Sequence, residues 1–115
     1  FGKAIKYNPD YAEAYYNRGY TYIQVDDYTN AIASFNKVIP LDSSFTLAYV
    51  NRGLAYYQIQ SYENSIEDME KAIELESSYR SQLDKFIKSS KEILEQKKKD
   101  MDKKKKEDKE KEEEK

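Results

Sequence analysis

Residues 14–22 read Ala-Tyr-Tyr-Asn-Arg-Gly-Tyr-Thr-Tyr, and residues 48–56 read Ala-Tyr-Val-Asn-Arg-Gly-Leu-Ala-Tyr. The two stretches share the initial Ala-Tyr, the central Asn-Arg-Gly and the final Tyr, and they lie 34 residues apart. The same offset relates further pairs of identical or similar residues: Tyr28 and Tyr62, Ile32 and Ile66, Phe35 and Met69, Lys37 and Lys71, Ile39 and Ile73, and Leu41 and Leu75. Repetition at a period of this size is typical of a helical solenoid.

Each copy contains two runs of residues at helical spacing. In the first copy these runs are Tyr15, Gly19 and Tyr22, followed by Tyr28, Ile32, Phe35 and Ile39. Because residues three and four positions apart lie on one face of an α-helix, each copy predicts a pair of helices joined by a turn. The sequence therefore predicts an all-α fold.

The repeated residues resemble the tetratricopeptide repeat, position by position. The matched positions are a large residue, a glycine, two aromatic residues, a small residue, a bulky residue and a compact residue. They fall on Tyr15, Gly19, Tyr22, Tyr28, Ala31, Phe35 and Val38, and in the second copy on Tyr49, Gly53, Tyr56, Tyr62, Ser65, Met69 and Ala72. The resemblance covers about residues 1–94 and implies an α-solenoid of antiparallel helix pairs.

The two glycines lie inside predicted helices, where glycine costs about 1 kcal/mol relative to alanine. Their recurrence indicates that the partner helix approaches closely, with Ala31 and Ser65 as the expected small partners. Arg18 and Arg52 precede these glycines, and we expect their stems to pack between helices while their charged ends stay in water.

Three features depart from the family pattern. The usual glycine of the turn between the two helices is Asp26 in one copy and Gln60 in the other, and the usual terminal proline is a serine in both. Pro40 instead falls late in the second helix of the first copy. Because proline lacks an N–H group and clashes with the preceding turn, we expect that helix to end or kink near Ile39.

The repeat register predicts the organisation of the chain. Residues 1–10 are expected to be the second helix of a preceding repeat, so the chain would be the C-terminal part of an array. Residues 11–44 and 45–78 are the two repeats, residues 79–95 a C-terminal capping helix, and residues 96–115 a charged tail that is either a helical extension or disordered. Asn8 and Pro9 suit the start of the first helix, and Ser43 or Ser44 suits the cap of the second repeat.

The predicted capping helix carries one apolar stripe, formed by Leu83, Phe86, Ile87, Ile93 and Leu94. An amphipathic helix buries such a stripe against a neighbour. No apolar partner helix follows it, so we expect it to cover the last hydrophobic face of the array.

Charge is segregated along the chain. Residues 91–106 contain eight lysines against four acidic residues, a net charge of +4, whereas residues 107–115 and residues 1–90 each carry −3. The basic block suits an acidic protein surface, a nuclear import receptor or nucleic acid. The alternative, a solvated tail or helix with internal ion pairs, is favoured because the adjacent acidic block competes for the same lysines.

Composition excludes several functions. The chain has no histidine and no cysteine, so it lacks the commonest general base, the thiol nucleophile and the standard zinc ligands. We expect no enzyme activity, no cofactor and no metal. No apolar run approaches transmembrane length. The lack of cysteine suits either redox environment and fixes no compartment.

The resemblance implies a peptide-binding groove lined by the first helix of each repeat. The ligand-facing positions fall on Glu13, Tyr16, Tyr20, Ile23, Gln24, Leu47, Val50, Leu54, Tyr57 and Gln58, with Asn17 and Asn51 beside them. These side chains are mainly aromatic, aliphatic or amide, a composition that suits protein recognition. Alternatively, they pack between successive first helices.

One subfamily binds acidic chaperone tails through a carboxylate clamp, and Asn17 and Asn51 resemble its asparagine. The cations that the clamp needs are missing, since the positions that follow Asn17 hold Leu47 and Asn51, and we disfavour this reading. Two hypotheses remain. The chain is a scaffold that binds a protein or peptide in the groove, or a structural element whose charged tail contacts an acidic protein or, less expected, nucleic acid.

Overall fold

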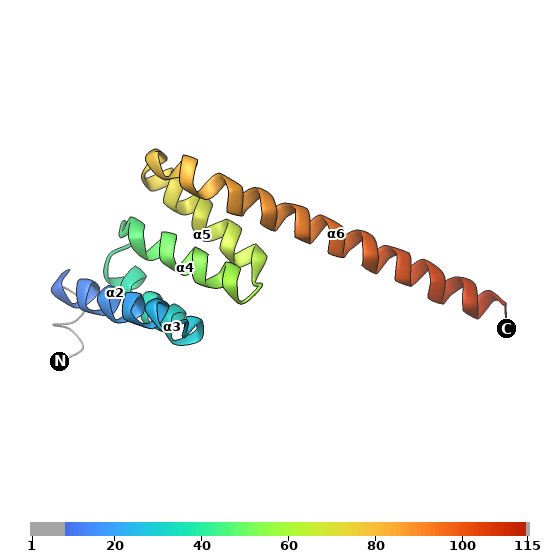
Figure 1. Ribbon diagram of the computed structural model, residues 1–115, viewed down its shortest axis with the longest axis horizontal. Helices are drawn as coiled ribbons and strands as arrows, with labels where there is room; N and C mark the ends of the chain where they lie inside the picture. Colours follow the sequence, from blue (N-terminus) through green and yellow to red (C-terminus); the bar gives the residue numbers. More distant parts are fainter. Residues whose placement is uncertain (1–8, 115) are drawn as a thin grey trace.

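The structure is a computed structural model that describes residues 9–114, and it is helical throughout with short turns (Figure 1). The elements are α2 (Pro9–Gln24), α3 (Tyr28–Leu41), α4 (Thr46–Gln58), α5 (Tyr62–Leu75), the 3-10 helix η1 (Ser77–Tyr79) and α6 (Arg80–Glu113). No strand occurs within residues 9–114, which confirms the predicted all-α fold. The helix expected before Asn8, and the cap expected at Asn8, lie outside the described residues.

The helices pack in chain order. α2 pairs with α3 and α4 pairs with α5, while α3 packs on α4 and α5 packs on α6. Two backbone hydrogen bonds close each hairpin turn. In the first hairpin they run from Asp27 N–H to Tyr22 C=O at 2.9 Å and from Asp26 N–H to Ile23 C=O at 3.0 Å. The equivalent bonds of the second hairpin run from Ser61 N–H to Tyr56 C=O at 2.8 Å and from Gln60 N–H to Tyr57 C=O at 3.0 Å. This is the Schellman arrangement of a helix end. The chain therefore forms the predicted solenoid of antiparallel helix pairs.

The turn residues Asp26 and Gln60 have positive φ angles of 60° and 67°. These are the two positions where the family pattern favours glycine. A side chain is disfavoured in this left-handed region because its Cβ approaches the following carbonyl oxygen. The turn geometry is thus kept without glycine.

Two apolar clusters form the core. One joins the first hairpin to the start of α4 and contains Phe35, Val38 and Ala48 among its buried residues. The other joins α4, α5 and α6 through Met69 and Leu83. Each cluster therefore links one hairpin to the element that follows it.

The two helical glycines lie at close helix contacts, as predicted, but their main partners differ from those expected. A Cβ at Gly19 would lie 2.6 Å from Cε1 of Phe35, and a Cβ at Gly53 would lie 3.0 Å from Cγ of Met69. Ser65 does contribute at the second site, since its hydroxyl donates a 2.8 Å hydrogen bond to the carbonyl oxygen of Gly53. At Gly19 the three nearest atoms all belong to the ring of Phe35, so the closest partner is a large residue and not the small one expected.

The junction between the repeats differs from the prediction. The helix was expected to end or kink near Ile39, but α3 continues through Pro40 and ends at Leu41, where the Asp42 N–H still bonds the carbonyl oxygen of Val38; the N–H that Pro40 lacks is lost within this last turn. Neither Ser43 nor Ser44 caps α4. Phe45 occupies the cap position without a side-chain bond, and the Ser44 N–H is instead bound by the carboxylate of Asp42 in a turn.

α6 begins against α5 and then extends away from the hairpins (Figure 1). Leu83, Ile87 and Ser90 are buried, and Leu83 and Ile87 belong to the cluster that contains Met69. Every residue from Glu95 to Glu114 is exposed. The residues beyond Gln96 are helical as far as Glu113. Within the described part of the chain, no helix is long and apolar enough to cross a membrane.

Candidate functional site

The twelve residues predicted to line the groove lie on α2 and α4, the first helices of the two hairpins, and we call their common side the first-helix face. They divide into three groups by burial. The exposed ones are Glu13, Asn17, Tyr20, Gln24, Leu47 and Gln58, the half-buried ones are Tyr16, Ile23, Asn51, Leu54 and Tyr57, and Val50 is buried.

Tyr16 is held by contacts within the chain. Its ring stacks on Phe45 with centroids 4.9 Å apart and lies 5.8 Å from the ring of Phe35. Its hydroxyl oxygen accepts a 2.9 Å hydrogen bond from the side-chain amide of Asn51 on α4. Burial raises the pKa of Tyr16, with Tyr20 adding to the rise, so the hydroxyl stays neutral. Tyr16 and Asn51 therefore join the two first helices.

Tyr57 is held in the same way against α6. Its ring meets the edge of Phe86 with centroids 5.2 Å apart, and its hydroxyl shares a 2.9 Å hydrogen bond with that of Ser89. Val50, 7% exposed, belongs to the cluster around Met69. The packing interpretation thus fits Tyr16, Val50 and Tyr57, and Val50 offers no surface to a ligand.

The remaining apolar surface of this face is carried by Tyr20 and Leu47. Their exposed fractions are 44% and 41%, the highest among the apolar residues of this face. The Tyr20 ring stacks on the half-buried ring of Tyr16, with centroids 6.3 Å apart. Tyr20 therefore has one ring face packed against Tyr16 and is otherwise open to solvent.

Three exposed amides accompany these apolar side chains. Within residues 11–114, the side-chain amides of Asn17, Gln24 and Gln58 make no hydrogen bond to protein. An exposed amide both donates and accepts, which matches the main chain of a bound peptide. The face contains one charged residue, Glu13, and no cation.

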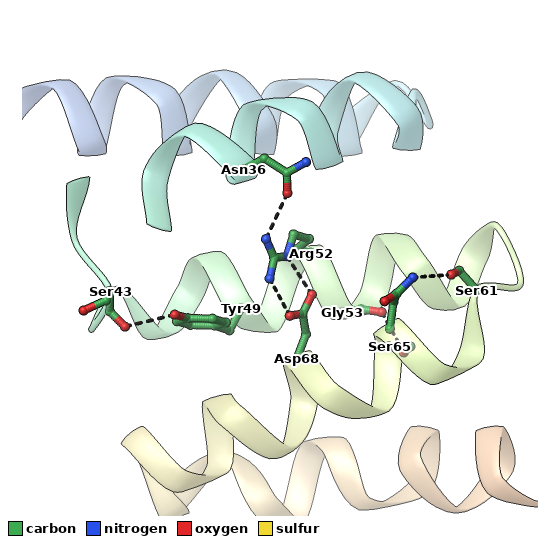
Figure 2. Close-up of polar contacts among 9 residues, drawn as sticks. Asn36, Ser43, Tyr49, Arg52, Gly53, Ser61, Ser65 and Asp68 are labelled. Carbon is green, nitrogen blue, oxygen red and sulfur yellow. Dashed lines mark hydrogen bonds and ion pairs between the residues drawn. The ribbon is translucent and has the colours of Figure 1, made fainter. Parts of the chain in front are cut away.

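The structure also shows a polar network that the sequence analysis missed. Arg52 donates from Nε and Nη2 to the two carboxylate oxygens of Asp68, both at 2.7 Å, and from Nη1 to Oδ1 of Asn36 at 2.9 Å (Figure 2). These three side chains come from α4, α5 and α3. The expectation that the charged end of Arg52 stays in water is wrong, because buried Asp68 binds it. The signal available in the sequence was an acid at position 68 where the first copy has Ser34.

The charges in this network stabilise each other. Burial raises the pKa of Asp68, and the hydrogen bonds and charge of Arg52 oppose that rise. Burial by itself lowers the pKa of Arg52, but the hydrogen bonds and charge of Asp68 outweigh it and raise the pKa, so Arg52 stays charged. The bidentate pair fixes α4, α5 and α3 together and is a structural element.

The basic part of α6 stands apart from the hairpins. Lys97 lies over the ring of Tyr62 at 5.3 Å from its centroid. Within residues 11–114, the ion pairs are Arg52–Asp68 and Lys71–Glu74, so no lysine beyond Lys97 is paired there. No group of three His, Cys, Asp or Glu side chains in this part of the chain is placed to hold a metal.

Comparison with known protein families finds a match for each of the two hairpins. Models of the tetratricopeptide repeat match residues 12–45 and residues 47–79, which correspond to α2 with α3 and to α4 with α5. The comparison with curated proteins finds no match.

Proposed function

The chain belongs to the tetratricopeptide repeat family, whose repeats generally mediate protein–protein interactions, and on that basis we propose that it is a scaffold that binds a peptide or a helix of another protein on its first-helix face. The observation that carries the proposal is the exposure of Tyr20 and Leu47 on α2 and α4. Proteins of this family are typically scaffolds without catalytic activity, and we propose none for this chain.

The chemistry of the face defines the ligand. An apolar or aromatic side chain of the ligand packs against Tyr20 and Leu47, and Leu54 on α4 adds a half-buried apolar group to the same face. The amides of Asn17, Gln24 and Gln58 pair with the ligand's main chain. A carboxylate clamp is not part of the proposal, because a bound carboxylate would meet no cation on this face.

The competing proposal is that the tail makes the contacts, and it rests on the exposed, unpaired lysines between Lys98 and Lys106. The two proposals differ in salt dependence. Binding through the tail rests on exposed charge and counterion release, so it weakens steeply as salt rises. Binding through Tyr20 and Leu47 changes little with salt.

The experiment is a selection of peptides from a random library on the intact chain, followed by titration of the selected peptides into variants. Tyr20→Ala with Leu47→Ala should weaken binding by about tenfold or more, as for anchor residues of an interface. The matched control is Val25→Ala with Ile59→Ala, which removes apolar groups that are at least as exposed, 69% and 45%, at the hairpin turns. Removal of residues 97–115 should leave binding unchanged.

The proposal fails if the control pair weakens binding as much as the Tyr20 and Leu47 pair. It also fails if removal of residues 97–115 abolishes binding while the double alanine variant binds normally. In that case the lysines of α6 are the working surface.

A further inference from the structure

The two hairpins carry a surface hollow in the same place. In the first hairpin its lining residues are Tyr15, Arg18, Ala33, Ser34 and Lys37, and the hollow measures about 170 Å³. Each of these has its counterpart, 34 residues later, among the residues that line a hollow of the second hairpin: Tyr49, Arg52, Glu67, Asp68 and Lys71. The repeat symmetry therefore allows a direct comparison of the two sites.

In the second hairpin the site contains its own anion. The carboxylate of Asp68 on α5 faces the guanidinium group of Arg52 on α4 and accepts two 2.7 Å hydrogen bonds from it (Figure 2). Asn36 accepts a third hydrogen bond from the same group. Each of the three nitrogens of this guanidinium group thus donates a hydrogen bond.

In the first copy the sequence offers neither partner. Ser34 replaces the aspartate, and a glycine, Gly2, stands 34 positions before Asn36. The guanidinium of Arg18 lies over the ring of Tyr22 at 5.9 Å and makes no hydrogen bond within residues 11–114. The hollow is lined by two cations, Arg18 and Lys37, and by no acid.

Ser34 supplies a second, independent indication. Its side chain is only 3% exposed, yet its hydroxyl has no hydrogen-bond partner within residues 11–114. Buried polar groups are normally paired, and those that are not call for an explanation. A hydroxyl donor beside an arginine and a lysine completes the set of donors that a carboxylate accepts.

We propose that the hollow formed by Tyr15, Arg18, Ser34 and Lys37 binds the carboxylate of an aspartate or glutamate side chain of a partner protein. The incoming carboxylate takes the place that Asp68 fills in the second hairpin, with its two oxygens toward Arg18, and the buried hydroxyl of Ser34 turns about its Cα–Cβ bond to donate to one of them. Residues 1–8 contain no aspartate or glutamate, so that segment does not provide it. The site lies apart from the first-helix face, and its test is independent of the proposed function.

The probe is N-acetyl-aspartate N-methylamide, whose only charge is the side-chain carboxylate, titrated at constant ionic strength. The readout is the Nε–Hε resonance of each arginine, and the chain has three, Arg18, Arg52 and Arg80. The Arg18 resonance should shift to saturation. Arg52 should not respond because Asp68 already holds it, and exposed Arg80 reports non-specific attraction. The neutral control is N-acetyl-asparagine N-methylamide, which should shift none of them.

Three variants test the individual contacts. Ser34→Asp should move the Arg18 resonance toward that of Arg52 and block the probe, because the chain then supplies its own carboxylate. Ser34→Ala should weaken binding of the probe as reported by the Arg18 resonance. Arg18→Gln removes that resonance, so binding is then measured from the backbone amide of Ser34, and the affinity should fall by about tenfold or more, as for loss of a hydrogen bond to a charged group. Arg18 is exposed, so that variant keeps the fold.

Several outcomes overturn the proposal. One is an equal, unsaturated response of Arg18 and Arg80. Others are an equal response to the asparagine control and full affinity in Ser34→Ala. If Ser34→Asp folds but leaves the Arg18 resonance in place and the probe bound, the hollow is not the equivalent of the Asp68 site.

Discussion

The ring of Phe35 on α3 fills the space directly beside the α-carbon of Gly19 on α2. A Cβ at position 19 would lie 2.6 to 2.9 Å from three carbons of that fully buried ring. At the equivalent Gly53 the nearest atom is 3.0 Å away and belongs to the flexible side chain of Met69. The repeated glycines therefore differ in how much substitution they tolerate.

We predict that Gly19→Ala destabilises the chain by about 1 to 3 kcal/mol, the usual cost of overpacking, since Phe35 has no space to move into. Gly53→Ala should cost less, because its closest contact is 3.0 Å rather than 2.6 Å and Met69 is more flexible than a ring, while the gain of about 1 kcal/mol in helix propensity is the same at both sites. Urea denaturation of both variants measures the difference. Equal midpoints for the two variants would show that the Phe35 contact does not control the first site.

We predict that Gln60→Gly stabilises the chain by up to about 1 kcal/mol, because glycine relieves the left-handed backbone at φ 67°. Asp26→Gly should gain less. Aspartate tolerates this region better than glutamine, and the Asp26 carboxylate accepts a 2.9 Å hydrogen bond from the hydroxyl of Tyr28. Thermal melting tests both, and a lower midpoint for Gln60→Gly would contradict the reading of this turn.

We predict that Asp68→Ala lowers the free energy of unfolding by about 2 to 4 kcal/mol, because it leaves Arg52 without its partner. This lies somewhat below the cost of breaking a fully buried pair, since the Arg52 side chain keeps 18% exposure. The double variant Arg52→Met with Asp68→Leu should recover most of the loss, because it leaves no unpaired charge. A double-mutant cycle in urea checks this, and additive losses would argue against coupling.

We predict that removal of residues 97–115 changes the unfolding midpoint little. The described residues of this segment are exposed, and the cation–π contact of Lys97 with Tyr62 is worth about 0.5 to 1 kcal/mol. Removal of residues 79–115 should unfold the second hairpin, because Leu83 and Ile87 cover Met69 and Ile73. Circular dichroism of the two truncated chains decides between these outcomes. A comparable loss in both would mean that the exposed end of α6 stabilises the array.

The repeat period made the architecture predictable. Residues 34 positions apart, such as Gly19 and Gly53, occupy equivalent places, and the helix pairs follow from that equivalence. The division into repeats, capping helix and tail remains a prediction. Features that depend on tertiary packing could not be predicted from the sequence. The sequence did not show that Phe45 rather than a serine takes the cap position of α4, where its ring stacks on Tyr16.

The site was predictable only as a face. The family resemblance placed twelve residues on one side of α2 and α4, but the burial of Val50 and the contact of Tyr57 with Phe86 depend on how α6 packs. The Arg52–Asp68 pair occurs in one repeat and not in the other, so a search for residues repeated every 34 positions could not find it. A comparison of the two copies for differences, such as Ser34 against Asp68, would have revealed it.

The central claim is that partners bind on the first-helix face, and the most direct measurement is a map of backbone amide shifts as a library-selected peptide is titrated into the intact chain. We predict that the largest shifts fall on α2 and α4 around Tyr20, Leu47 and Leu54, and that they persist at high salt. Shifts confined to α6 between Lys97 and Lys106, and lost as salt rises, would contradict the claim.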